Sequence, residues 1–187
     1  MMSAIYPERM KVPETRREAF DRLRQMMKGD VRRILDWSEG GNYVAALLIA
    51  IGSEGLSKLR DQRDETLFVG LLEKHGLTRE MAADVFGALR HGLAHVYDTK
   101  FIRAGDLKIE LIVSWGKRKH LTVRRDPPGL YLNVRTMWAD LWDVFQDLKR
   151  SLPPGGELPR RWLTTREKAA DSRSIADWKR WIHRHEG

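Results

Sequence analysis

The chain of 187 residues contains no cysteine. Disulfide bonds are therefore excluded, and so is any metal site that depends on thiolate ligands. A protein without cysteine also fits a reducing compartment. The fold must then be held by packing and hydrogen bonds, and thiol chemistry is removed from the functions to consider.

Long apolar runs are also lacking. The longest, Tyr43 to Ile51, is far shorter than the roughly 20 residues needed to span a bilayer. The opening stretch, Met1 to Pro13, has no apolar segment of the kind found in signal peptides. We therefore expect a soluble, cytoplasmic protein with no membrane partner.

Acidic residues are fewer than basic ones. The chain has 26 Asp and Glu against 34 Lys and Arg, which gives a net charge of +8. Such an excess favours a polyanionic partner through phosphate contacts and the release of counterions. The remaining composition, 42% apolar and 32% charged, is ordinary for a globular domain with its own core.

Most of the chain shows the three- and four-residue apolar spacing of amphipathic helices. Capping and breaking residues divide this pattern, with Asn42, Asp64 and Thr78 as the expected N-caps of the second, third and fourth helices. The predicted helices are Glu14 to Trp37, Tyr43 to Leu59, a third ending near His75-Gly76, a fourth ending near Tyr97-Asp98, and Thr136 to Leu152. The stripe of the fourth helix that should face the core is Met81, Val85, Leu89 and Leu93.

Between the fourth and fifth helices the pattern changes to that of strands. Leu107 to Trp115 and His120 to Arg125 are predicted to form an antiparallel hairpin through the turn Gly116 to Lys119. A third short strand is expected at Leu130 to Val134. The sequence therefore predicts a mainly α protein, a helical bundle with a small antiparallel β-hairpin or sheet inserted before the last bundle helix.

Pro153-Pro154-Gly155-Gly156 is the best candidate for a linker. We therefore expect a bundle over residues 1–152, with the β insertion at about 105–134, and a basic C-terminal segment over 153–187. Trp178 and Trp181 in that segment are three residues apart, and we expect them to dock onto the bundle or onto a partner chain.

The fourth helix carries an unusual density of ionisable groups. On an ideal helix, Asp84, His91, His95 and Asp98 share one face, with Arg90 and Tyr97 beside them. One interpretation is a solvated surface, in which histidines near the helix end are favoured by the helix dipole.

Two other interpretations give this face chemistry. His91 and His95 have the i, i+4 spacing of zinc ligands, but no Glu follows His91, so the hydrolytic zinc pattern is incomplete. The other is phosphodiester cleavage, in which a histidine transfers a proton and an arginine holds the phosphate, with no metal or other cofactor. Arg90 and His95 are separated by about 140° around the helix, so two copies facing each other would bring them together better than one.

The segment Arg90-His91-Gly92-Leu93-Ala94-His95 resembles the R-x(4–6)-H signature of the HEPN superfamily (higher eukaryotes and prokaryotes nucleotide-binding). With Tyr97 it is also similar to the longer R-x(4)-H-x-Y form, found in HEPN toxins that pair with small nucleotidyltransferase antitoxins. The resemblance covers about Tyr43 to Lys100.

This resemblance implies an HEPN-like bundle that dimerises and a metal-independent endoribonuclease site. By the same resemblance, His95 is the general acid/base and Arg90 the phosphate-binding residue, while His91 supports them. Tyr97 matches the position that the antitoxin can modify. The settings implied are a toxin–antitoxin pair, defence or RNA processing, with an antitoxin or nucleotidyltransferase as partner. The alternative is a non-catalytic HEPN-like module that binds nucleotide, RNA or protein.

Basic residues outside the helix suggest where RNA would bind. Between Gly116 and Arg125 there are five Lys or Arg residues and no acid, which would make an electropositive finger at a hairpin tip. The predicted nucleic-acid contacts are Lys100, Lys117, Arg118, Lys119, Arg124 and Arg125. Trp115 would either stack on a base or lie in the core.

Overall fold

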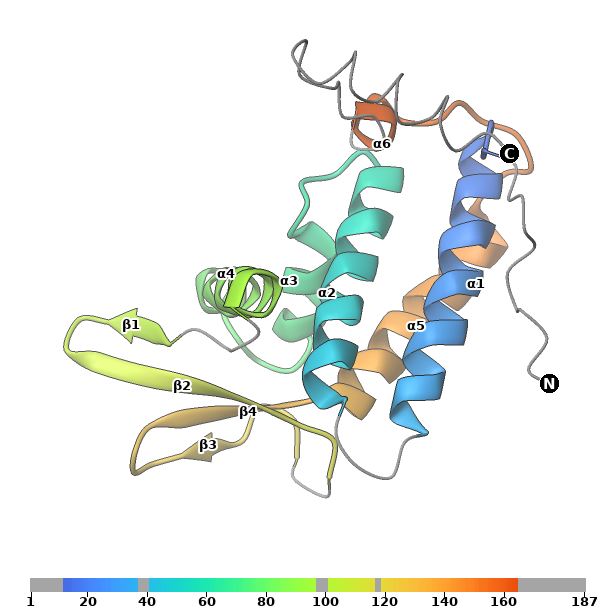
Figure 1. Cartoon of the computed structure of the whole chain (residues 1–187). Coiled ribbons are helices and arrows are strands. Elements are labelled where there is room, and N and C mark those ends of the chain that lie inside the picture. The colour runs from blue at the N-terminus through green and yellow to red at the C-terminus, as the bar shows by residue number, and fades with distance from the viewer. Residues whose placement is uncertain (1–11, 37–40, 97–100, 117–118, 165–187) are drawn as a thin grey trace, which may run out of the picture.

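The computed structural model describes residues 12–36, 41–96, 101–116 and 119–164. Six helices and a small four-stranded sheet make up this part of the chain, and helix predominates (Figure 1). The mainly α class predicted from the sequence is confirmed. None of the described helices combines the length and the apolar character needed to cross a membrane.

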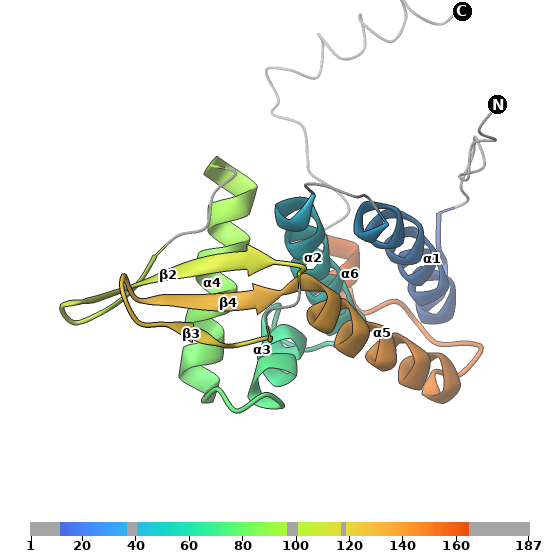
Figure 2. The ribbon, with the colours of Figure 1, turned by 90° about the horizontal axis from the view of Figure 1, so that it is seen from below.

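Three long helices lie side by side and enclose much of the core (Figures 1 and 2). They are α1 (Arg16–Leu35), α2 (Asn42–Leu59) and α5 (Val134–Ser151). Phe20 of α1 and Phe145 of α5 are fully buried, with ring centroids 5.9 Å apart. The short α3 (Thr66–Glu73) and α4 (Arg79–Val96), which is as long as α2, pack on the other side of α2. α2 is therefore the central helix, as expected.

The starts of the helices confirm some of the predicted caps and contradict others. The hydroxyl of Thr78 accepts a hydrogen bond from the amide of Met81, as expected of the cap of α4. α1 begins at a cap that was not predicted, Thr15, which forms a capping box with Glu18. The prediction that Asn42 caps α2 was wrong. Gly41, at φ 77°, holds that position, because the Asn42 side chain instead donates to the carbonyl of Val113 in the sheet.

Two further details of the helices differ from expectation. The residue at the N-cap of α3 is Glu65 and not Asp64, whose carboxylate lies 3.6 Å from Lys58 Nζ. Val85, Leu89 and Leu93 of α4 are buried as predicted, but Met81 is 51% exposed. The predicted core stripe of α4 thus begins one turn later than expected.

The sheet contains β1 (Ile102–Ala104), β2 (Leu107–Ser114), β3 (Val123–Arg124) and β4 (Gly129–Asn133), in the order β1-β2-β4-β3. The predicted hairpin between the second and third of these segments was wrong. β2 pairs in parallel with β4, and β3 pairs antiparallel with β4, so the sheet is mixed. β2 forms its hairpin with β1, a strand that the sequence analysis did not predict, through Gly105 at φ 61°.

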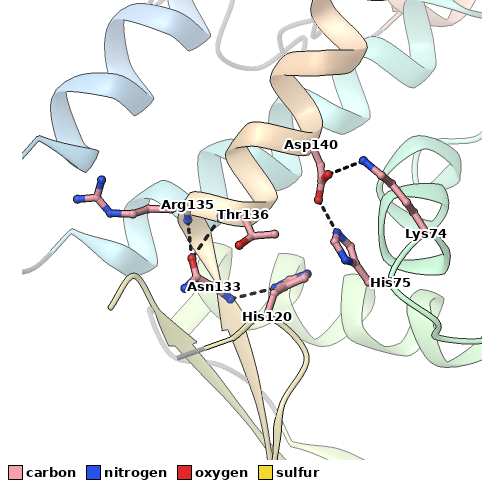
Figure 3. Close-up of polar contacts among 7 residues, drawn as sticks. All are labelled: Lys74, His75, His120, Asn133, Arg135, Thr136 and Asp140. Carbon is pink, nitrogen blue, oxygen red and sulfur yellow. Dashed lines mark hydrogen bonds and ion pairs between the residues drawn. The ribbon is translucent and has the colours of Figure 1, made fainter. Parts of the chain in front are cut away.

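Asn133, at the junction of β4 and α5, is a buried polar residue that holds this topology. Its Oδ1 accepts hydrogen bonds from the amides of Arg135 and Thr136, which caps α5 (Figure 3). Its Nδ2 donates to the carbonyl of Gly116. The end of β2 is thereby tied to the start of α5, which draws β4 in beside β2.

Replacing Asn133 by alanine is expected to lower the free energy of unfolding by about 1–2 kcal/mol, since the cap is lost and the carbonyl of Gly116 loses a donor. Urea denaturation measures the change. Asn133→Ser keeps an acceptor at the cap and should lose less. Equal losses for Ser and Ala would contradict the capping role.

The segment proposed as a linker returns to the bundle. The carbonyl of Gly156 accepts a hydrogen bond from the amide of Arg16, and Glu157 forms a β-bridge with Thr15. The short α6 (Arg160–Thr164) then packs on α2. Trp178 and Trp181 lie outside the described residues.

Candidate functional site

Arg90 is held on α4 by a carboxylate from the neighbouring helix α2. Its Nε donates to Glu54 Oε2 over 3.2 Å, and the two side chains are 29% and 18% exposed. A guanidinium carries five N–H donors, so this contact uses one of them. Arg90 is therefore oriented by the fold while its side chain still reaches solvent.

Glu54 also accepts from Lys58 Nζ, at 2.6 Å, one turn further along α2. Burial raises the pKa of Glu54, but the hydrogen bonds from Lys58 and Arg90 outweigh it and hold the pKa below its ordinary value of 4.5. Glu54 is thus ionised at neutral pH, and it offsets part of the positive charge of the two cations.

The other residues of the predicted active site follow Arg90 along α4. His91 is exposed, and the next two residues, Gly92 and Leu93, are buried. His95 also belongs to α4, but its side chain lies outside the described residues, as do Tyr97 and Lys100. Arg90 and His91 therefore mark the accessible side of the helix just before His95.

The basic residues predicted to contact nucleic acid fall into different environments. Lys119 and Arg125 are exposed, and Lys117 and Arg118 lie outside the described residues. Arg124 is half-buried, where it forms an ion pair with Glu110 and donates to the carbonyl of Pro127 over 2.8 Å. Its charge is therefore shared with a carboxylate.

Trp115 is half-buried and packs against the core. The guanidinium of Arg135 lies 5.9 Å from its ring centroid. Of the two roles considered for Trp115, packing is the one that these contacts favour.

A second polar cluster, which the sequence analysis missed, joins α3, α5 and the sheet (Figure 3). Asp140, on the buried face of α5, accepts from Lys74 Nζ at 2.7 Å, and its other oxygen lies 2.6 Å from His75 Nε2. Burial raises the pKa of Asp140, but these two partners lower it below 3.8 overall. A carboxylate between the core residues Met137 and Leu141 was the one signal in the sequence.

His120 lies next to this cluster, with its ring edge-on to that of His75 at a centroid distance of 4.9 Å. Its Nδ1 is 3.1 Å from the amide of Asn133, and because a backbone N–H can only donate, Nδ1 must be unprotonated. Burial and the nearby His75 lower the pKa of His120 to about 4. His120 is therefore neutral at physiological pH.

The arrangement around Asp140 is better suited to structure than to catalysis. The cavity beside it, lined by His120, Asp140 and apolar side chains, has a volume of about 10 Å³. A single water needs about that much space, so no substrate can enter. Among the described residues, moreover, no three His, Asp or Glu side chains are placed to hold a metal ion.

A functional proposal for this chain has to depend on the geometry of Arg90 and its neighbours. Compared with known proteins, the chain matches no family model, no curated protein and no solved structure.

Proposed function

We propose that the protein is a metal-independent endoribonuclease of the HEPN type, in which Arg90 binds the scissile phosphate and His95 transfers the proton. The observation that carries the proposal is the position of Arg90. Its guanidinium is fixed by Glu54 on an accessible face of α4, five residues before His95. A preoriented cation of this kind stabilises the charge that builds up on a phosphate during cleavage.

The reaction uses the ribose 2′-hydroxyl as nucleophile. A histidine with a pKa near neutrality takes its proton, the oxygen attacks the adjacent phosphorus, and the 5′-oxygen of the next nucleotide leaves with a proton. The products are a 2′,3′-cyclic phosphate and a 5′-hydroxyl. No step requires a metal ion.

A homodimer completes the site in this proposal. Five residues along a helix turn the chain by about 140°, so Arg90 and His95 of one α4 point in different directions. A two-fold contact between two α4 helices places Arg90 of one chain across from His95 of the other, and builds two equivalent sites in one cleft. The net charge of +8 attracts the RNA to this cleft, in a toxin, defence or RNA-processing setting.

The test is incubation of the purified protein with a single-stranded RNA and with DNA of the same sequence, both in EDTA. We expect the RNA alone to be cut, with cyclic-phosphate ends, because DNA lacks the nucleophile. Uncut RNA in the presence of the folded dimer would refute the proposal. So would cleavage that EDTA abolishes.

The same face of α4 could serve a non-catalytic module that binds nucleotide, RNA or protein. The ion pair between Arg90 and Glu54 is compatible with this second candidate as well, because an oriented guanidinium can hold a phosphate without any chemical step. This candidate predicts RNA binding without cleavage, and binding that survives His95→Ala.

Glu54 is a positioning residue in this proposal. Glu54→Ala should lower kcat for RNA cleavage by about tenfold, since Arg90 is no longer held in place, while Glu54→Gln keeps an acceptor and should retain most of the rate. Asp64→Asn is the matched control, because Asp64 also lies near Lys58 but does not contact Arg90. Equal effects of Glu54→Ala and Asp64→Asn would contradict the positioning role.

A further inference from the structure

A cleft of about 320 Å³ opens between the first half of α4 and the sheet, away from the α1, α2 and α5 side of the protein. In Figures 1 and 2, α4 lies across one face of the sheet. The residues that line the cleft are Leu77, Met81, Asp84, Val85, Ile102, Ala104, Leu107, Ile109 and Leu130. Its volume is at the lower end of the range found for small-molecule sites.

The floor of the cleft is an apolar face of the sheet. Ile102 is paired with Ile109 and Ala104 with Leu107, and residues paired in this way point to the same side. Nearer the core, Leu111 of β2 and Leu132 of β4 are buried, whereas Leu107 of β2 is 47% exposed. The sheet thus meets the protein core at one end and diverges from α4 at the other.

Asp84 is the only charged residue among those that line this cleft. Within the described part of the chain, no residue forms an ion pair with it. It also lines an adjoining hollow of about 270 Å³, together with Phe101 and Arg103. A single carboxylate at the edge of an apolar cleft attracts a cation and repels an anion.

We propose that this cleft binds a small organic cation, an amine with an apolar body. The apolar part would cover Met81 and Leu107, both half-exposed, and bury them against the sheet face. The ammonium group would donate to the Asp84 carboxylate in a charge-assisted hydrogen bond. This site is separate from the proposed ribonuclease function, and its occupancy can be measured without RNA.

The test is a titration of the full chain with 2-phenylethylammonium, 2-phenylethanol and phenylacetate, which share a phenyl body and differ in charge. Amide ¹H–¹⁵N shifts of Met81, Asp84 and Ala104 report on the cleft. We expect millimolar binding of the ammonium, roughly five- to tenfold tighter than the alcohol, and the weakest binding for the carboxylate.

Asp84→Asn should bring the ammonium and the alcohol to the same affinity. Glu80→Gln is the matched control, because Glu80 lies one turn earlier on α4 but does not line the cleft, and it should keep the preference. Ala104→Leu should weaken all three ligands by filling the space. The proposal is overturned if no ligand shifts these amides, if phenylacetate binds best, or if the preference persists in Asp84→Asn.

Discussion

Replacing His95 by alanine is expected to lower the rate of RNA cleavage by about 100-fold or more, with the fold preserved. Alanine can neither take the proton from the 2′-hydroxyl nor deliver one to the leaving oxygen, and general acid–base catalysis contributes at least this much. The measurement is the initial rate of cleavage of one RNA oligonucleotide in EDTA. The far-ultraviolet circular dichroism of each variant verifies its fold.

His91→Ala is the matched control for this experiment. His91 lies one turn earlier on the same helix and is exposed, and in our proposal it only supports the reaction. Its replacement should cost distinctly less than that of His95. An unchanged rate in His95→Ala, or an equal loss in both variants, would remove His95 from the role of general acid/base.

Acidification from pH 6.5 to pH 4 is expected to lower the free energy of unfolding by about 3 kcal/mol through His120 alone. The pKa of this residue is about 4 in the folded protein, against its ordinary value of 6.5. Between these two pH values the unfolded chain binds a proton that the folded protein does not, so stability falls as the pH falls. Above pH 6.5 the effect is absent.

The pH dependence can be assigned to His120 with one variant. In His120→Asn the side-chain oxygen still accepts from the amide of Asn133, but nothing titrates at this position. Urea denaturation at pH 7, 5.5 and 4.5 should give a steep fall for the wild type and a shallow one for the variant. Parallel curves would contradict the assignment. The pKa of Asp140 is lowered from its ordinary value of 3.8. Asp140 therefore loses its contribution to the free energy of unfolding only at a pH below this value.

The helices could be predicted from the sequence because their signals are local. The spacing of apolar residues, Thr78 as a cap, and the Gly40-Gly41 pair predict α1 and α4 within about two residues of their observed ends. The placement of Arg90 and His91 on an accessible face of α4 follows from the same periodicity. The residues that start, end and orient a helix lie within that helix or directly beside it in the sequence.

The strand order could not be predicted in this way, because it depends on contacts distant in sequence. Adjacent strands usually pair, so β2 and β3 were expected to form a hairpin. Instead, the side chain of Asn133 donates a hydrogen bond to the carbonyl of Gly116, and the backbone amide of Asn133 donates one to Nδ1 of His120. No local pattern near residue 116 indicates this partner seventeen positions away.

The ion-pair partners of these ionisable groups could not be predicted from the sequence for the same reason. Glu54 and Arg90 are separated by 36 residues, and His75 and Asp140 by 65. Each looks in the sequence like an ordinary surface charge. Only the packing of α2 against α4, and of α3 against α5, brings them within hydrogen-bonding distance.

In the proposed homodimer, Arg90 of one chain and His95 of the other act on the same phosphate. The decisive experiment uses a dimer that contains one Arg90→Ala chain and one His95→Ala chain, isolated through two different affinity tags. Such a dimer keeps one complete site of two, so it should cleave RNA at about half the wild-type rate, while either variant alone is inactive. A mixed dimer as inactive as the two variants would contradict the shared site.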